Sequence, residues 1–75
     1  MQLKTFGKIS EIIDKEISID FPVTLRDFEI KICKEFPLLA TNTYIIAINE
    51  GIITEDNFMI NEHDTIALLP PFSGG

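Results

Sequence analysis

The residues best suited to chemistry stand at the end of the sequence, where Gly74 and Gly75 follow Pro70 and Pro71. Consecutive prolines end a β-ladder and hold the backbone in an extended form, and the two glycines carry no side chain. When fully extended, residues 70–75 span roughly 20 Å. The stretch predicts a narrow tail that carries the carboxylate of Gly75 into another protein's active site. The alternative is a frayed terminus without function.

The chemistry that suits such a tail is acyl activation. A carboxylate resists nucleophiles because its leaving group would be oxide, whereas an acyl-adenylate accepts sulfur or an amine and releases AMP. Glycine at the reacting carbonyl leaves both of its faces uncrowded. Attack by sulfur would leave Gly75 as a thiocarboxylate, and attack by a lysine amine would join it to a target protein. In either case the catalytic groups would belong to the partner.

Other reactive side chains lack the neighbours that chemistry requires. Cys33 is the single cysteine, so no internal disulfide can form, and it falls on a predicted helix without an obvious base beside it. His63 lies in a polar turn without the spacing of a metal-ligand set. Glu55, Asp56 and Asn57 do not match a calcium loop. Without a phosphate loop or a catalytic triad, the isolated chain is predicted to have no turnover and to bind no cofactor or metal.

Size and charge exclude several classes of protein. A chain of 75 residues forms one small domain, which leaves no room for a large buried active site. The net charge of −6 argues against nucleic acid as a partner, because phosphate binding needs a cationic surface. No apolar run is long enough to cross a membrane or to form a signal peptide, so a reducing, cytoplasmic location is expected. The charge either keeps the domain soluble or steers it toward a basic partner.

The elements that would position the tail follow from hydropathy patterns along the chain. Period-2 alternation predicts strands, a spacing of three and four predicts a helical turn, and polar or glycine-containing stretches predict turns. The expected strands cover residues 1–6, 16–20, 44–48, 52–53 and Thr65–Leu69, the helical turn covers 8–14, and the turns cover 49–51 and 61–64. Residues 38–42 read as a connection, residues 57–60 are ambiguous, and Gly51 is expected to adopt a positive φ in its turn.

Residues 24–36 give the clearest helix. Thr24 occupies the N-cap position with the acidic Asp27 three residues later, and Pro37 ends the pattern. One face is apolar and contains Leu25, Phe28, Ile32 and Phe36. This order of elements predicts an α+β domain over residues 1–69, with one main helix across one face of a mixed sheet. The last strand is expected inside the sheet, because so apolar a strand would aggregate at an edge.

An apolar docking patch is expected on the face of the sheet away from the helix. Alternation in the last strand turns Ile66 and Leu68 toward the core and Leu69 toward the opposite face. The same alternation places three further apolar residues beside Leu69. The predicted patch comprises Phe6, Ile45, Ala47 and Leu69. The alternative is ordinary packing, because a shift of one residue in register would exchange the two faces.

The sequence resembles a known family along most of its length. The predicted tail comprises Pro70, Pro71, Phe72, Ser73, Gly74 and Gly75. This tail, residues 64–69 before it, the opening residues 6–12 and residues 47–49 are similar to the small, sulfur-carrying subunit of molybdopterin synthase. The match is poorest over residues 37–43 and 54–60. Phe72 departs from the smaller aliphatic residue of that family, which suggests a partner channel widened to match.

The resemblance implies a ubiquitin-like β-grasp fold and a defined role for Gly75. A ubiquitin-activating-type enzyme would adenylate this glycine with ATP and Mg²⁺, and sulfur would then convert it to a thiocarboxylate. Inserted into the large subunit of molybdopterin synthase, in a heterotetramer, Gly75 would supply sulfur to cyclic pyranopterin monophosphate. Gly74 would be the thin neck behind it.

Rival functions share the same tail chemistry. A sulfur carrier for thiamine or for tRNA thiolation is the nearest rival, although residues 8–14 argue against the thiamine type, whose first strand typically turns straight into the second. A ubiquitin-like modifier would join Gly75 to lysines of target proteins. A plain binding module would not need the tail at all.

Overall fold

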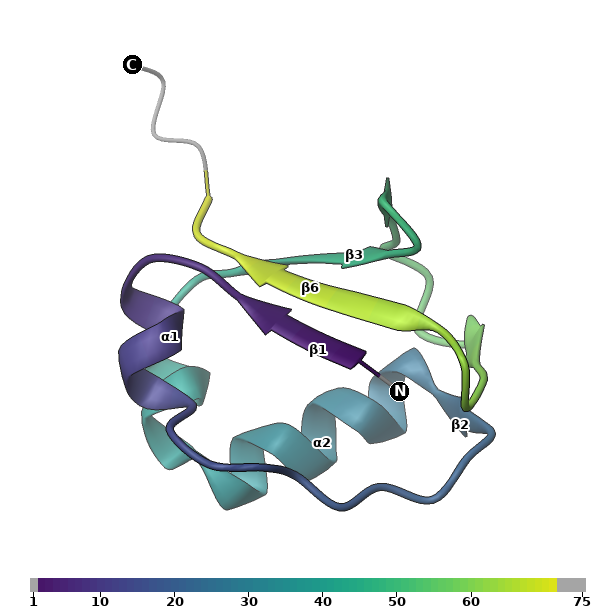
Figure 1. The fold of residues 1–75 in the computed structure, drawn as a ribbon, viewed down its shortest axis with the longest axis horizontal. Coiled ribbons are helices and arrows are strands. Elements are labelled where there is room, and N and C mark those ends of the chain that lie inside the picture. The colour runs from purple at the N-terminus through teal and green to yellow at the C-terminus, as the bar shows by residue number, and fades with distance from the viewer. Residues whose placement is uncertain (1, 72–75) are drawn as a thin grey trace.

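The chain folds around a mixed four-stranded sheet with the main helix on one face (Figure 1). The computed structural model describes residues 2–71. The elements in chain order are β1 (Gln2–Thr5), α1 (Lys8–Ile12), β2 (Val23–Thr24), α2 (Leu25–Glu35), the 3₁₀ helix η1 (Pro37–Thr41), β3 (Ile45–Ile48), β4 (Gly51–Ile52), β5 (Met59–Ile60) and β6 (Thr65–Leu69).

The last strand lies inside the main sheet, as its apolar sequence predicts. The strand order is β1-β6-β3-β4, with β6 parallel to β1 and antiparallel to β3. Strand β4 pairs with β3 as a short hairpin, and β2 and β5 form a separate two-stranded ladder. Because β6 has a partner on each side, this apolar strand is not left at an edge with unpaired backbone groups.

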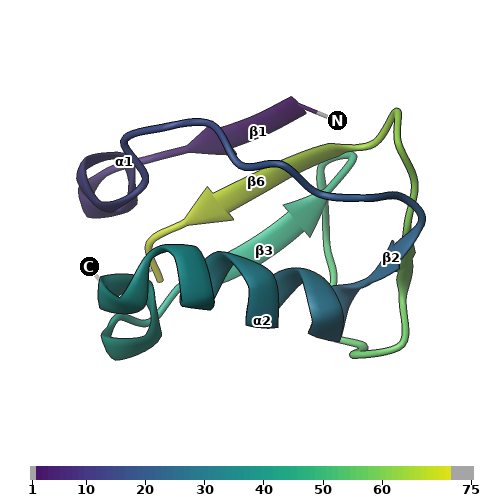
Figure 2. The same cartoon turned by 90° about the horizontal axis from the view of Figure 1, so that it is seen from below.

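The main helix begins and ends where the sequence predicts. The Oγ1 atom of Thr24 accepts a hydrogen bond of 3.2 Å from the backbone N–H of Asp27, which satisfies one of the free donors of the first turn. The helix ends at Glu35, two residues before Pro37, which cannot continue a helix. Figure 2 shows α2 lying across the face formed by β6 and β3.

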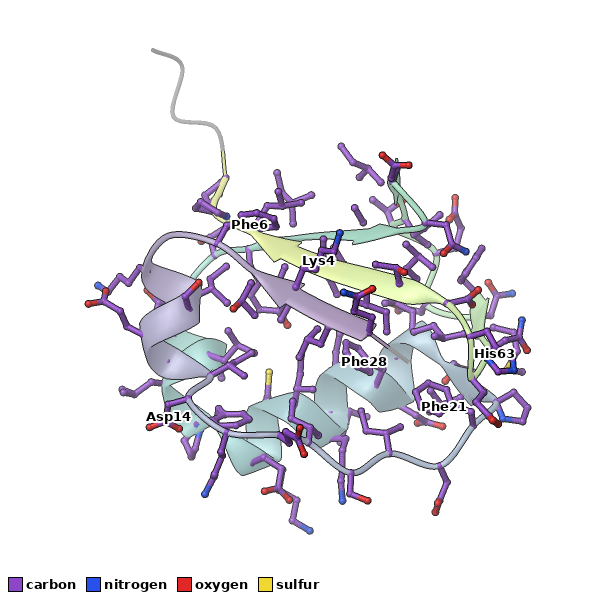
Figure 3. All side chains as sticks on the ribbon, in the orientation of Figure 1. Lys4, Phe6, Asp14, Phe21, Phe28 and His63 are labelled. Carbon is purple, nitrogen blue, oxygen red and sulfur yellow. The ribbon has the colours of Figure 1, made fainter. Side chains whose placement is uncertain are left out.

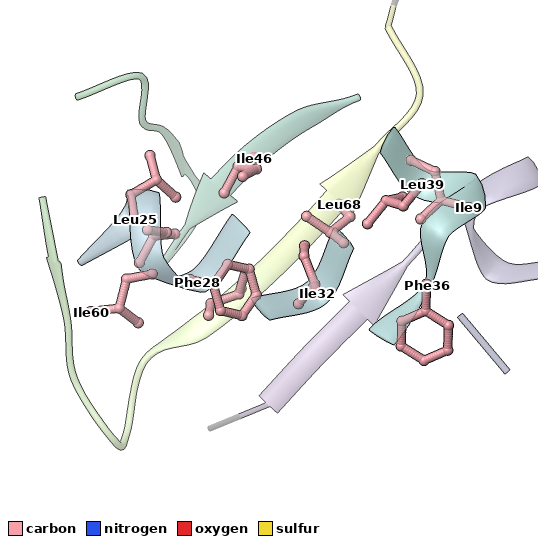
Figure 4. Close-up of a cluster of buried hydrophobic side chains, with 11 residues drawn as sticks. Ile9, Leu25, Phe28, Ile32, Phe36, Leu39, Ile46, Ile60 and Leu68 are labelled. Carbon is pink, nitrogen blue, oxygen red and sulfur yellow. The ribbon is translucent and has the colours of Figure 1, made fainter. Parts of the chain in front are cut away.

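The core lies between α2 and the inner face of the sheet (Figure 4). Phe28 and Ile32 of α2 are completely buried, and so are Ile66 and Leu68 of β6. The other members of the cluster are Ile9, Leu25, Phe36, Leu39, Ile46, Ile48 and Ile60. Within residues 2–71 every buried side chain is apolar, so the fold depends on apolar burial.

The strand predicted over residues 16–20 is absent, and this prediction is wrong. The alternation is nevertheless real, because Ile17 and Ile19 are half-buried against the core and their neighbours are exposed. The backbone here does not pair with β1, and residues 13–17 instead line a cleft of about 600 Å³ beside that strand. Alternation therefore reports which side chains are buried, whereas a strand also needs a backbone partner within hydrogen-bonding reach.

Two smaller expectations also differ from the structure. The turn after β3 has positive φ at Asn49 (51°) and Glu50 (72°), whereas Gly51 belongs to β4 and was wrongly expected to carry the positive φ. Two consecutive positive φ values match the twist of a two-residue hairpin loop, so the turn falls before the glycine. The segment expected as a plain connection over residues 38–42 contains η1, and the ambiguous residues 57–60 contain β5.

Candidate functional site

The base of the predicted tail is held by the turn that follows β1. The backbone N–H of Phe6 donates a 3.2 Å hydrogen bond to the carbonyl of Leu68, near the end of β6. Gly7 has a φ of 60°, and a Cβ atom added to it would lie 3.4 Å from Cγ of Pro70. A larger residue would therefore be strained by its own backbone and crowded by this proline. The turn supports the point at which the chain leaves the sheet.

The tail itself is only partly within the described residues. Pro70 and Pro71 are exposed and belong to no strand. Phe72, Ser73, Gly74 and Gly75 lie outside the described residues, so the predicted sulfur site at Gly75 and the division of the chain at residue 69 stay predictions.

The strand registers define the outer face, which is the side of the sheet away from α2. Paired residues direct their side chains to the same side of a sheet. Leu69 pairs with Ile45, and Ala67 pairs with Lys4 on one side and Ala47 on the other. Ala47 also pairs with Ile52 of β4. The outer face comprises Gln2, Lys4, Phe6, Ile45, Ala47, Ile52, Thr65, Ala67 and Leu69.

The four residues of the predicted docking patch lie together on this outer face, at unequal depths. Phe6 is 46% exposed, and Ile45 and Leu69 are half-buried. Ala47 is only 7% exposed, so it forms the floor of the patch and offers little surface to a partner. Their position is consistent with docking beside the tail, and their role in docking stays a prediction.

Sequence reasoning missed two exposed residues of the outer face. Ile52 is 63% exposed and stands beside Ala47, and the exposed Lys4 lies two residues before Phe6 (Figure 3). Alternation alone could have placed Lys4 on the same side as Phe6. Ile52 could not be placed, because its side depends on the two-residue turn that sets the register of β3 with β4.

A hydrogen-bonded junction joins the turn after β3 to the turn before β6. Nδ2 of Asn49 donates to Oδ1 of Asp64 at 2.9 Å, and Oδ1 of Asn49 accepts from the N–H of Thr65 at 3.0 Å. Oδ2 of Asp64 accepts from the N–H of Asn61 at 2.8 Å. The backbone bond from Asn61 lowers the pKa of Asp64 below its ordinary 3.8, and the bond from Asn49 makes a smaller contribution in the same direction. The junction holds the far ends of β3 and β6 together.

Cys33 and His63 do not belong to the outer face. Cys33 is half-buried, and its Sγ lies 3.7 Å from the hydroxyl of Tyr44, which donates to Oε1 of Glu29 at 3.1 Å. Burial raises the pKa of Tyr44, and the bond with Cys33 and the charge of Glu29 add to this effect. These contacts connect α2 to the start of β3. His63 is exposed in the turn before β6.

The described part of the chain contains neither a cluster of metal-binding side chains nor a helix that could cross a membrane. Over residues 2–71 no three His, Cys, Asp or Glu side chains are grouped to hold a metal ion. None of the helices described there is long and apolar enough to cross a membrane. That the chain binds no cofactor of its own stays a prediction.

The mixed sheet, the single main helix across it and the strand that leads into the tail define a ubiquitin-like β-grasp protein. A putative subunit 1 of molybdopterin converting factor from Pyrococcus furiosus has the same fold, with a TM-score of 0.79, 17% identity, and 93% of this chain and 94% of that chain covered. A chain from the complex of subunits 1 and 2 of molybdopterin-converting factor from Helicobacter pylori 26695 is 28% identical, with a TM-score of 0.68, over 97% of this chain and 95% of that chain.

The sequence comparisons identify the family. The model of the ThiS family matches residues 3–75, which includes the tail and both terminal glycines. The molybdopterin synthase sulfur carrier subunit of Dictyostelium discoideum is 34% identical over 77 aligned positions, covering 93% of this chain and 90% of that protein. The chain belongs to the ThiS family.

Proposed function

We propose that the chain is the sulfur carrier subunit of molybdopterin synthase. The observation that carries the proposal is the family match through Gly75, because it includes the tail on which the chemistry depends. The relative from Dictyostelium discoideum bears that name, and the related complex from Helicobacter pylori joins subunit 1 to subunit 2. The partner of this chain is accordingly the large subunit, in a heterotetramer.

The reaction cycle takes place at the Gly75 carboxylate and in two partner enzymes. In the adenylating enzyme, which is of the ubiquitin-activating type, the carboxylate attacks the α-phosphate of ATP with Mg²⁺ and releases pyrophosphate. A sulfur nucleophile then displaces AMP and leaves a thiocarboxylate. In the large subunit this sulfur is transferred to cyclic pyranopterin monophosphate, and water restores the carboxylate. A dithiolene contains two sulfurs, so each product consumes two loaded chains.

The described residues would serve this cycle by docking and positioning. The outer face offers apolar surface directly beside Leu69, and the tail begins after this residue with Pro70 and Pro71. The bond from Phe6 to Leu68, together with the position of Pro70 close to Gly7, fixes the starting point of the tail relative to that face. Docking of the face thereby limits the positions that Gly75 can reach, which reduces the entropic cost of reaching the active site.

A carrier for thiamine or tRNA thiolation would undergo the same two steps, adenylation and formation of the thiocarboxylate. A protein modifier would share only the adenylation step. The helix α1, at Lys8–Ile12, occupies the region that sequence reasoning used against the thiamine type. The substrate that accepts the activated Gly75 therefore distinguishes the candidates.

The test is a reconstitution followed by intact mass. We expect the chain, incubated with its adenylating enzyme, ATP, Mg²⁺ and a sulfur donor, to gain the mass of one oxygen-to-sulfur exchange at Gly75. With the large subunit and cyclic pyranopterin monophosphate, the exchange should reverse as molybdopterin forms. A variant lacking Gly75 is the control, and it should bind the large subunit without forming product. A loaded chain that reacts only with lysines, or yields no molybdopterin, would contradict the proposal.

A further inference from the structure

Charge is distributed very unevenly between the main sheet and the rest of the chain. The sequence contains twelve acidic residues, yet β1, β3, β4 and β6 contain none of them. The only charged residue in these four strands is Lys4. The outer face therefore carries one positive charge, on a surface whose other residues are the uncharged polar Gln2 and Thr65 and six apolar residues, although the whole chain has a net charge of −6.

Within the described residues, the ammonium group of Lys4 forms no ion pair with an acidic side chain. Ala67 on β6 is the register partner of Lys4, β1 has no neighbouring strand on its other side within residues 2–71, and Gln2 and Phe6 are the neighbours of Lys4 on the same face along the chain. Phe6 and Ile52 are the exposed apolar residues of the same face, at 46% and 63% exposure. Among the described residues, the one ion pair within 4.0 Å joins Lys31 to Glu35 on α2, so it does not involve Lys4.

An apolar partner that covered this face would impose a desolvation cost at Lys4. An ammonium group removed from water loses its hydration, and only an opposite charge or several hydrogen-bond acceptors can replace it. A carboxylate is the side chain that does so most effectively, because its bond to an ammonium is charge-assisted.

A second copy of this chain does not meet this requirement. Two copies packed through their outer faces about a two-fold axis would present the same surface to each other. The face contains no carboxylate, so the outer face of a second copy offers no opposite charge to Lys4. Lys4 would lose its hydration without gaining an opposite charge, so the face suits a different partner better than itself.

We infer that the partner docked on the outer face presents a carboxylate that pairs with Lys4, set within an apolar surface that covers Phe6 and Ile52. The inference rests on the proposed function, in which that partner is the large subunit of molybdopterin synthase. Lys4 is then a specificity-determining residue. A partner surface without the carboxylate is rejected, because it would leave the ammonium group buried and unpaired.

The experiment measures the dissociation constant of the full-length chain and its cognate large subunit at fixed ionic strength. Lys4→Met keeps most of the aliphatic stem and removes the charge, and Lys4→Glu reverses the charge. Lys31→Glu is the matched control, because it changes the net charge as much as Lys4→Glu but lies on α2, away from the outer face. Far-UV circular dichroism and urea unfolding confirm that each variant is folded.

If a carboxylate lies opposite Lys4, Lys4→Met should raise the dissociation constant about 10-fold or more, and Lys4→Glu about 30-fold or more. The control Lys31→Glu should raise it less than about 3-fold. Tighter or unchanged binding by Lys4→Met overturns the inference, because an apolar partner without a carboxylate would favour methionine. That result leaves the proposed function intact. A wild-type chain that does not bind the large subunit overturns the proposed function and this inference with it.

Discussion

Gly7, which lies beside the start of the tail, occupies a position that tolerates few residues other than glycine. Its φ of 60° and ψ of −137° belong to a backbone region that only glycine adopts readily, and Pro70 lies against the site where a Cβ would be. Gly51 provides a contrast, because its φ is not positive and an added Cβ would meet the carbonyl oxygen of Ile48 at an ordinary 3.7 Å. The two glycines allow a matched test.

Gly7→Ala is expected to lower the free energy of unfolding by about 1–3 kcal/mol, because alanine is strained at this φ and its methyl group crowds Pro70. Gly51→Ala should change it by less than about 0.5 kcal/mol, as exposed substitutions usually do. Urea unfolding of both variants measures the difference. Equal effects at the two positions would show that the turn after β1 is not strained.

The role of a single residue could be predicted from the sequence where it follows from the type of the residue or from a local pattern. Gly75 was proposed from the order of prolines and glycines, and Leu69 from alternation in one strand. Ile52 was missed because its face depends on pairing with β3, and pairing follows from the turn geometry of Asn49 and Glu50. Local patterns reveal residue types and periodicity, whereas the neighbours of a residue depend on contacts between distant segments.

The hydrogen bonds of Asn49 with Asp64 and Thr65 join the turn after β3 to the turn before β6. Asn49 follows β3 and Asp64 precedes β6, and these two strands bring the outer face and the start of the tail together. The helix and most strands were predictable because capping and alternation are local. The strand over residues 16–20 was not, because Ile17 and Ile19 can bury their side chains without pairing with β1.

The junction has a defined dependence on pH. The folded chain holds the pKa of Asp64 below 3.8, so its carboxylate stabilises the folded state above that pH, and the contribution is lost as pH falls through the lowered value. Asp64→Asn should therefore lower the urea midpoint at neutral pH. The difference from wild type should shrink below pH 3.8, where the protonated acid resembles the amide.

Urea midpoints measured from neutral pH down to the acid limit of folding provide the check. Glu62→Gln is a suitable control, because Glu62 is exposed in the same turn and its side chain makes no hydrogen bond within residues 2–71. A difference for Asp64→Asn that stays constant with pH would mean that the charge of this carboxylate does not stabilise the junction.

In the molecule as a whole, the acidic residues that produce the net charge of −6 lie outside the strands of the proposed docking surface. The acidic residues occupy the helices, the turns and the segment between α1 and β2, so they surround the sheet without entering it. Such an arrangement can attract a basic surface from a distance while the contact area contains no charge except that of Lys4. Long-range attraction of this kind acts mainly on the association rate.

The association rate with the large subunit is accordingly expected to fall roughly tenfold between about 0.01 M and 0.1 M salt, because the Debye length shortens from about 30 Å to about 10 Å. The dissociation rate should change much less, since the apolar contact is not screened. Stopped-flow mixing measures both rates. Asp14→Asn, Glu16→Gln and Asp20→Asn together remove three of the six net negative charges and should weaken the salt dependence by roughly half. An association rate that ignores salt would mean that the charge serves solubility and not steering.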